Sequence, residues 1–340
     1  MNKFTNKSWF LGIDISKETL DVSLINQSDS KIFMDKKINN TLDGFEKMNR
    51  WLSKKHISIK DCLICMEHTG VYGLLLIIWL HQQDVAFCVE SGLQIKKSLG
   101  IARGKNDKID ARRIAIYAME KKDKLKPFVL PAENLMEIKQ LLTYRDQLVR
   151  LRTSFKNSLK SHIEYKKIIS SDYVTSDITK QIESLDESID QTEKQIIATI
   201  KSDKELNKNF SLATSVKGIG LVIAAFMLVS TNNFTGFENG RKFACYSGIA
   251  PFPYESGESI KKQTKVSNYS NKKLKSMLSN GANSAKRHDP EIRAYYKRKT
   301  KEGKDHKLVI NAISCKLVNR VFAVVKRQSP YVSLYQQKFA

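Results

Sequence analysis

The chain has 340 residues, enough for two domains and a sizeable core, and its 41% hydrophobic and 9% aromatic content excludes an intrinsically disordered protein. Lysine and arginine together number 58 against 35 aspartates and glutamates, so the formal net charge is +23 at pH 7. So positive a chain is expected to bind a polyanion, above all nucleic acid, whose phosphates supply affinity through counterion release.

The N-terminal segment MNKFTNKSWF lacks the apolar core and the cleavage site of a secretory signal peptide. No apolar run reaches the roughly 18 residues that a membrane-spanning helix needs. The longest candidate, Gly73 to Leu80, is short enough to be a buried helix. We therefore expect a cytoplasmic protein that works on nucleic acid and not in a membrane.

Residues 8–128 are predicted to form an α/β domain. The expected strands are Phe10–Ser16, Leu20–Asn26, Lys31–Ile38, Cys62–Glu67 and Val85–Val89. The expected helices are Leu42–Lys55, Val71–Gln82, Leu93–Leu99 and Asp107–Lys121. This order of elements is typical of a ribonuclease H-like fold, in which helices lie on the faces of a mixed sheet.

The five cysteines, Cys62, Cys65, Cys88, Cys245 and Cys315, are odd in number and scattered, which argues against a disulfide framework. Cys62 and Cys65 form a C-x-x-C pair, but no second pair completes a zinc site. Both lie in the apolar run DCLICM, so we expect them to be core residues of a strand.

After the two prolines of PFVLPAEN, residues 132–207 are predicted to form a helical arm. Apolar side chains recur three and four residues apart on both sides of the polar break SSDYVTSD. They are Leu141, Tyr144, Leu148, Leu151 and Phe155, and then Ile178, Ile182, Leu185, Ile189 and Ile196. The spacing predicts two antiparallel helices of a coiled-coil hairpin, with a helical linker packed on its own domain as the alternative.

Residues 208–330 are predicted to form a mainly helical C-terminal domain. Gly218-Ile219-Gly220 precedes an apolar helix, and such a turn presents backbone N–H groups to a phosphate, as helix-hairpin-helix modules do. A short helix is expected at Arg241–Cys245, followed by a Gly-, Pro- and Ser-rich loop, SGIAPFPYESGES. Two basic helices are expected at Lys272–Arg287 and Lys307–Arg327.

Two acidic residues occupy neighbouring strands of the predicted sheet. Asp14 lies mid-strand in LGIDIS, where Ile13 and Ile15 point to the opposite face. A carboxylate in that position is costly unless it is paired or binds a cation. Glu67 ends its strand in CMEHTG, and a salt bridge is the alternative role for it. Because the strands are neighbours, the two carboxylates can converge.

Asp107 and Asp110 stand three residues apart at the start of a predicted helix, hence on one face. A helix cap or a first-turn acid is the structural alternative for each, and which of them would ligate directly stays open. With Asp14 and Glu67 they place four acids at one end of the sheet. Hard divalent cations prefer oxygen ligands and stabilise phosphoryl transfer, so we predict a Mg²⁺ or Mn²⁺ site.

The segments GIDISKETLDV, MEHTG and KNDKIDARRIA resemble the acidic motifs of the DEDD-type insertion-sequence transposases. That family joins a RuvC-like nuclease domain to a C-terminal transposase domain with a serine. Four later segments resemble the second domain in the same order: VKGIGLVIAA, YSGIAPFPYESGESI, NKKLKSMLSNGANSA and KLVINAISCKLVNRVFAVV. The resemblance covers nearly the whole chain, and it implies that Asp14, Glu67, Asp107 and Asp110 are a catalytic, metal-binding tetrad.

The resemblance also implies a catalytic serine, Ser256, in the motif YESGES. The adjacent glycine lets a phosphate approach the backbone, and attack by the serine Oγ would hold the broken DNA strand covalently. Ser247 is the rival because it also precedes a glycine, and Ser259 is a weaker one. The expected nucleic-acid contacts are Arg103, Lys105, Gly218, Gly220, Lys261, Lys262 and Lys265.

These expectations describe a transposase or site-specific DNA recombinase of a mobile element. The resemblance implies double-stranded element and target DNA, a guide RNA, and a homodimer or tetramer whose composite sites join the tetrad of one subunit to the serine of another. Two other functions remain open: a RuvC-like structure-specific nuclease that needs no serine, and a non-enzymatic basic protein that coats nucleic acid. Phosphate charge alone does not distinguish RNA from DNA as the partner.

Overall fold

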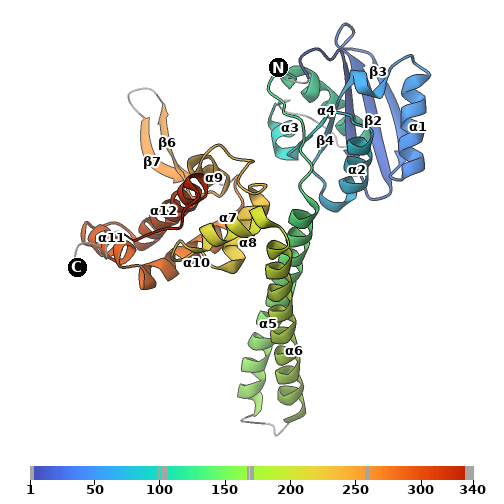
Figure 1. The fold of residues 1–340 in the computed structure, drawn as a ribbon. Helices are drawn as coiled ribbons and strands as arrows, with labels where there is room; N and C mark the ends of the chain where they lie inside the picture. Colours follow the sequence, from blue (N-terminus) through green and yellow to red (C-terminus); the bar gives the residue numbers. More distant parts are fainter. Residues whose placement is uncertain are drawn as a thin grey trace. The chain divides into compact units, whose positions relative to one another are not determined.

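The computed structural model describes residues 4–98, 100, 106–166, 168, 172–256, 260–267 and 269–333. The chain divides into two compact units, Met1–Leu130 and Pro131–Ala340 (Figure 1). The predicted arm, residues 132–207, falls in the second unit together with the C-terminal helices. The division into three domains, with the bounds expected from the sequence, stays a prediction.

A five-stranded mixed sheet forms the centre of the first unit, with strand order β3-β2-β1-β4-β5 (Figure 1). The strands are β1 (Trp9–Ile15), β2 (Thr19–Asn26), β3 (Phe33–Asn39), β4 (Cys62–Glu67) and β5 (Phe87–Glu90). Strands β1, β2 and β3 are antiparallel neighbours, whereas β4 runs parallel to β1 and to β5. The end of β1 that carries Asp14 therefore lies beside the end of β4 that carries Glu67, as predicted.

Helices cover both faces of this sheet, which confirms the expected α/β class. They are α1 (Leu42–Ser53), α2 (Leu74–Gln82), α3 (Gly92–Ser98) and α4 (Asp107–Lys121), with short 3₁₀ helices η1 (Ile59–Asp61) and η2 (Gly70–Gly73). Side chains alternate along the strands, so Ile13 and Ile64 pack with α1 and α2, whereas Phe10 and Leu63 pack with α3 and α4. Asp14 belongs to the α3 and α4 face by the same alternation.

The C-x-x-C pair of β4 is split between the two faces of the sheet. Cys62 belongs to the core under α1 and α2, whereas Cys65 belongs to the core under α3 and α4. Both are buried and carry free thiols. The expectation that they are core residues is confirmed, and side chains on opposite faces cannot chelate one metal ion together.

Helix α4 lies directly on strand β1, and a glycine makes this approach possible. A Cβ added to Gly12 would lie 2.9 Å from Ala115 Cα and closer still to the Ala111 carbonyl oxygen. Ala111 and Ala115 are 1% and 0% exposed, so the helix presents small side chains at this contact. The first turn of α4 is thereby held close to the strand end that carries Asp14.

An ion pair joins α4 to β3, the strand at one edge of the sheet. Arg112 donates from Nε to Asp35 Oδ1 at 3.1 Å and from Nη2 to Asp35 Oδ2 at 2.5 Å. Ser23 donates to the same carboxylate at 2.9 Å, and Lys108 lies 3.2 Å away. Burial alone would raise the pKa of Asp35, but the hydrogen bonds from Arg112, Ser23 and Lys108 outweigh it and hold that pKa below its ordinary value.

Two long helices of the second unit, α5 (Glu133–Lys166) and α6 (Asp172–Lys201), lie side by side (Figure 1). Ion pairs join Arg145 to Glu193 at 2.6 Å and Arg152 to Asp186, and this order shows that the helices run antiparallel. Both helices are longer than the apolar pattern indicated: α5 begins before Leu141 and packs Leu135 and Ile138 in a core cluster that also holds Ile200, near the end of α6. The coiled-coil geometry expected for this arm stays a prediction.

The rest of the second unit is mostly helical, as expected. Its helices are α7 (Lys204–Thr214), α8 (Leu221–Ser230), α9 (Gly240–Tyr246), α10 (Lys272–His288), α11 (Pro290–Lys301) and α12 (His306–Arg327). Helix α12 runs through the core, where Ile313, Leu317 and Val321 are 0% exposed and share one cluster with Leu278 of α10 and Phe243 of α9. Helices α7 and α11 were not expected, because charged side chains obscure their apolar periodicity.

Helix α12 is the one described helix long and apolar enough, by length and composition alone, to span a membrane. This differs from the expectation that no segment reaches that length, because α12 is interrupted by single polar residues such as Ser314 and Asn319. Its apolar residues pack in the core of the second unit, which accounts for them without a membrane. The cytoplasmic location stays a prediction.

The Gly-, Pro- and Ser-rich segment that was expected as a loop contains a β-hairpin. Strands β6 (Pro251–Ser256) and β7 (Ile260–Val266) pair antiparallel, with an irregularity between Phe252 and Tyr254. Two prolines in β6 obscured the strand, since proline cannot donate to a ladder. It is tolerated here because a two-stranded ribbon has only edge strands.

Candidate functional site

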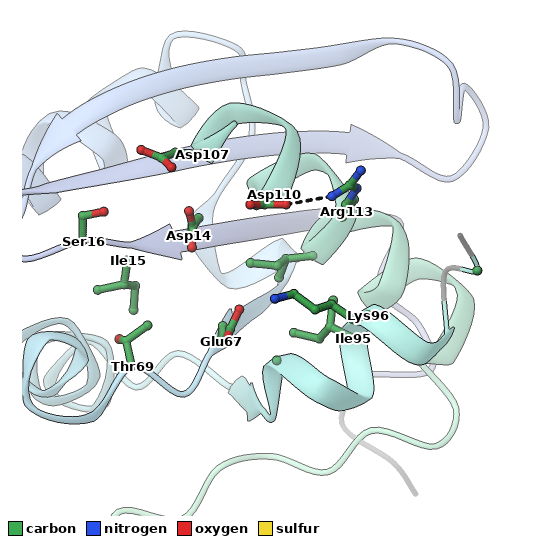
Figure 2. A pocket seen from close by; sticks show the side chains of 13 residues that line it. Asp14, Ile15, Ser16, Glu67, Thr69, Ile95, Lys96, Asp107, Asp110 and Arg113 are labelled. Atoms are coloured by element: carbon green, nitrogen blue, oxygen red, sulfur yellow. Dashed lines mark hydrogen bonds and ion pairs between the residues drawn. The ribbon is translucent and has the colours of Figure 1, made fainter. Parts of the chain in front are cut away.

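A pocket of about 550 Å³ lies at the end of the sheet on the face covered by α3 and α4. The four acids predicted as a tetrad, Asp14, Glu67, Asp107 and Asp110, all line it (Figure 2). The other lining residues are Ile15, Ser16, Thr69, Gly92, Ile95, Lys96, Gly100, Arg113 and Ile114. The structure thus brings together side chains that lie almost a hundred residues apart in the sequence.

Two of the acids owe their position to the sheet. Strands β1 and β4 are parallel neighbours in which Ile13 pairs with Met66, so the next residues, Asp14 and Glu67, project from adjacent strand ends. Both point to the α4 side because side chains alternate along a strand. The two carboxylates are thus fixed by the backbone pairing of the most buried strands in the unit.

The other two acids belong to the first turn of α4. The helix is capped by Asn106, whose side chain accepts a hydrogen bond from Lys108 N at 3.0 Å. The alternative that Asp107 or Asp110 caps this helix is therefore wrong, whereas the alternative that each is a first-turn acid is confirmed. Asp110 instead accepts a hydrogen bond from Arg113 Nη1 at 3.0 Å, one turn further along the helix.

The carboxylates of the pocket influence one another. Burial and then repulsion from Asp107, Asp110 and Glu67 raise the pKa of Asp14 to about 6 from an ordinary value of 3.8, and Asp21 on the paired strand adds to this. Burial and the neighbouring carboxylates thus both disfavour the ionised form of Asp14. A bound cation would favour that form.

Glu67 packs directly on the start of helix α3. A Cβ added to Gly92 would lie 2.9 Å from Glu67 Oε2 and closer to Oε1, so a larger residue at this position would displace the carboxylate. Thr69, two residues after Glu67, has a buried hydroxyl without a hydrogen-bond partner in the described part of the chain. The wall of the pocket therefore holds oxygen atoms whose bonding capacity is unused.

The donor set fits a hard divalent cation. Four carboxylates and a hydroxyl supply only oxygen ligands, and no histidine or cysteine lines the pocket. As they stand, no three acidic, histidine or cysteine side chains among the described residues lie close enough together to hold one ion. After burial, repulsion from the other three carboxylates is the main cause of the raised pKa of Asp14.

Lys96 and Arg113 were not predicted to belong to the site, although both line the pocket. Arg113 was hidden in the run DARRIA, because the sequence does not show which of two adjacent arginines faces the sheet end. Lys96 was one of many exposed lysines. Only the spacing of three residues from Asp110 to Arg113, which places both on one helix face, was a usable signal.

The predicted serine lies in the second unit. Ser256 is the last residue of β6 and pairs with Ile260 across the hairpin. Lys261, Lys262 and Lys265 lie on β7, opposite residues of β6. Arg103, Lys105 and Ser259 lie outside the described residues. The catalytic role of Ser256 and the nucleic-acid contacts stay predictions.

The rival serine and the glycine turn have structural roles of their own. Ser247 is 0% exposed, and its hydroxyl donates to the Phe243 carbonyl at 2.7 Å, so it is not available to a substrate as it stands. Gly218 has φ +97° and packs 2.5 Å, measured from an added Cβ, from the Gly281 carbonyl oxygen of α10. Gly220 precedes α8 and is exposed, so its role as a phosphate contact stays a prediction.

Comparison with known proteins gives two family matches and several relatives. A model of DEDD transposases of the IS110 type matches residues 11–166, and one described as the transposase IS116/IS110/IS902 family matches residues 211–297. The pilin gene-inverting proteins of Moraxella bovis and Moraxella lacunata are each 29% identical over 331 residues, which covers 95% of this chain and 97% of theirs.

Two further similarities cover less of the chain. An uncharacterized 42 kDa protein of insertion element IS900 from Mycobacterium paratuberculosis is 26% identical over 159 residues, which covers 46% of this chain and 39% of that protein. Among solved structures, T. thermophilus RuvC in complex with a Holliday junction substrate aligns at 11% identity with a TM-score of 0.28. That alignment covers 35% of this chain and 99% of RuvC.

Proposed function

The chain belongs to the IS116/IS110/IS902 family of transposases, and from this premise we propose that it exchanges DNA strands in a metal-dependent reaction with a serine nucleophile. The observation that carries the proposal is the pocket into which Asp14, Glu67, Asp107 and Asp110 project from three elements of the first unit. A purely structural role would not favour this arrangement, because carboxylates gathered in a partly buried pocket repel one another.

The four carboxylates would hold Mg²⁺ or Mn²⁺. When bound, such ions neutralise charge on the phosphate and stabilise the attacking and leaving oxygens. The part of the chain is to fix the donors: Asp14 and Glu67 on paired strands, and Asp107 and Asp110 on the first turn of a helix packed against those strands. Strand exchange is therefore expected to stop in EDTA.

Ser256 supplies the nucleophile. Its Oγ forms a bond to phosphorus while the bond from phosphorus to the 3′ oxygen breaks, and that oxygen leaves as a hydroxyl with the serine proton. The cut strand stays attached through its 5′ phosphate as a phosphoserine ester. A 3′ hydroxyl of the second DNA then attacks the ester phosphorus, and the proton returns to Ser256.

Double-stranded DNA of the element and of the target is the proposed substrate. The net charge of +23 supports a polyanionic partner, and the Moraxella relatives are named for the inversion of a gene, a rearrangement that requires cutting and rejoining. We include in the proposal a guide RNA and a homodimer or tetramer with composite sites. A discrete RNA species that co-purifies with the protein would support the guided reaction.

The test of the chemistry is strand exchange between element and target DNA by variants of each candidate group. Asp14→Ala and Ser256→Ala are each expected to lower exchange by at least about a hundredfold and to leave nucleic-acid binding intact. A denaturing gel of the stalled reaction should show a protein–DNA adduct with the unaltered chain and none with Ser256→Ala. Ser247→Ala is the matched control and should keep the adduct, since that hydroxyl is buried.

The same experiment distinguishes the other functions. Cleavage by the Ser256→Ala variant, without an adduct, would show a junction nuclease and contradict the covalent serine. Full activity in EDTA would contradict the metal site. A chain that binds nucleic acid but neither cuts nor exchanges strands, and that is unaffected by loss of all four acids, would be a coating protein.

A further inference from the structure

Two positive side chains stand in the wall of a pocket that is otherwise lined by acids. Lys96 comes from α3 and Arg113 from α4, and both line the cavity with the four carboxylates. Figure 2 shows the amino group of Lys96 extending from its helix into the pocket and Arg113 bound to Asp110 at the opposite wall. Cations from two separate elements therefore face the same space.

The placement of Arg113 contrasts with that of the residue before it. Arg112 is directed to β3, where both its Nε and Nη2 bind Asp35 and its guanidinium lies 4.9 Å from the Phe33 ring centre. Arg113 is turned to the pocket, where one N–H binds Asp110 and the side chain stays 24% exposed. Arg112 therefore binds helix α4 to β3, and Arg113 makes no contribution to that contact and lines the pocket.

Arg113 has donors to spare. A guanidinium carries five N–H groups in a planar fork, and the bond to Asp110 uses one of them at 3.0 Å. Lys96 has three donors and pairs with no acidic side chain among the described residues. Their unused donors face a space where the acids alone would repel an anion.

We propose that Lys96 and Arg113 form a phosphate-binding subsite, in which their N–H groups bind the non-bridging oxygens of the DNA phosphate that is cut. The inference rests on the proposed function and deepens it. The oxygens that carry the phosphate charge then have positively charged donors within the acidic pocket, and Arg113 matches phosphate geometry because its fork binds two oxygens at once. Asp110 orients the guanidinium for this contact.

The experiment measures two affinities of the full-length protein by calorimetry: Ca²⁺ alone, and thymidine 3′,5′-bisphosphate in the presence of Ca²⁺. Lys96→Gln and Arg113→Gln are each expected to weaken nucleotide binding about tenfold, because each removes charged hydrogen bonds to phosphate. Both should bind Ca²⁺ as tightly as the unaltered chain or a few-fold tighter, because a positive charge beside the carboxylates has been removed.

Loss of nucleotide affinity without loss of Ca²⁺ affinity separates the proposal from a general loss of structure, which would weaken both affinities. Lys97→Gln, on the same helix but outside the pocket lining, is the matched control and should change neither affinity. Arg113→Lys keeps the charge without the fork, so its nucleotide affinity should lie between those of the unaltered chain and Arg113→Gln.

Nucleotide binding that is unchanged in both glutamine variants, or absent from the unaltered chain, would overturn the subsite. The strand-exchange assay reports the proposed function independently. An unaltered chain that exchanges strands, with variants that bind nucleotide normally, would refute the subsite alone. A chain without exchange whose variants lose nucleotide affinity would refute the proposed function and leave the subsite standing.

Discussion

Asp14 shows how a functional carboxylate is kept in a strand of apolar residues. Its neighbours Ile13 and Ile15 are buried in the core under α1 and α2, and Asp14 faces the pocket on the other side of the sheet. Its backbone is paired with Asp21 of β2, and its partly buried side chain is held beside the other pocket carboxylates. The strain of four gathered acids is therefore stored in the folded state and is expected to be measurable.

Replacing Asp14 by asparagine should stabilise the metal-free protein. The raised pKa of about 6 means that the folded chain loses stability as pH rises from the ordinary value of 3.8 through 6, since the ionised form is disfavoured. Asp14→Asn removes that penalty, so the free energy of unfolding at pH 7.5 in EDTA should rise by about 1 to 2 kcal/mol. Urea unfolding would measure this.

Two checks accompany the Asp14 experiment. At pH 4 the difference between the chains should shrink, because Asp14 is then protonated in the folded state. With Mg²⁺ the order should reverse, since only the unaltered chain keeps all four carboxylates for the cation. An Asp14→Asn chain that is less stable than the unaltered chain at pH 7.5 in EDTA would contradict the conclusion that ionised Asp14 destabilises the folded protein.

At the scale of the elements, the distance between helix α4 and strand β1 determines the geometry of the pocket. Gly12 allows the helix backbone to touch the strand, and the Arg112–Asp35 pair holds the same helix to β3. These two contacts together define where Asp107 and Asp110 stand relative to Asp14. A change that leaves every acid in place but separates the helix from the strand should therefore impair the site.

Gly12→Ala provides that change. The added methyl group would meet backbone atoms of Ala111 and Ala115, which cannot rotate away, so α4 must shift. We expect a loss of about 1 to 3 kcal/mol of stability, typical of an overpacked core, together with Ca²⁺ affinity at least about tenfold weaker. Urea unfolding and calorimetry would measure the two effects.

The control for Gly12→Ala is a core change of similar cost on the other face of the sheet. Ile64→Val removes one methylene from the core under α1 and α2 and should cost about 1 kcal/mol. It should leave Ca²⁺ affinity unchanged, because it does not touch α4. Equal affinity losses in both variants would show that stability, and not the spacing of helix and strand, controls the site.

The elements that could be predicted were those with clear periodicity. The bounds Cys62–Glu67 and Asp107–Lys121 agree with β4 and α4, because a buried strand and a capped amphipathic helix have distinct patterns. The hairpin β6–β7 was missed because Pro251 and Pro253 read as a loop. Pocket residues such as Lys96 and Arg113 could not be assigned, since their direction depends on how α3 and α4 are rotated on the sheet.

At the scale of the whole molecule, charge dominates the expected behaviour. A net charge of +23 makes binding to DNA depend strongly on salt, because each phosphate contact releases counterions. Between 50 and 200 mM salt we expect the affinity for duplex DNA to fall by about a thousandfold or more. Fluorescence anisotropy would measure this, and Ser256→Ala should give the same slope because serine carries no charge.

An affinity that hardly changes over that salt range would contradict phosphate contacts as the main source of binding. The sequence made this property predictable from composition alone. It did not show how Asp14 and Glu67 converge with the first turn of α4, which depends on the register of β1 against β4 and on the close approach at Gly12. The order of helices and strands follows from local sequence patterns, whereas the convergence of the four acids depends on packing between distant segments.

Helix α12 also determines when the molecule can become complete during synthesis. It supplies the centre of the second core, yet it is the last described helix to leave the ribosome, whereas the first unit ends at Leu130. Units fold in the order of their synthesis, so the carboxylate pocket forms while the serine-bearing unit still lacks its central helix. A nascent or prematurely terminated chain therefore carries the carboxylate pocket without a completed serine-bearing unit.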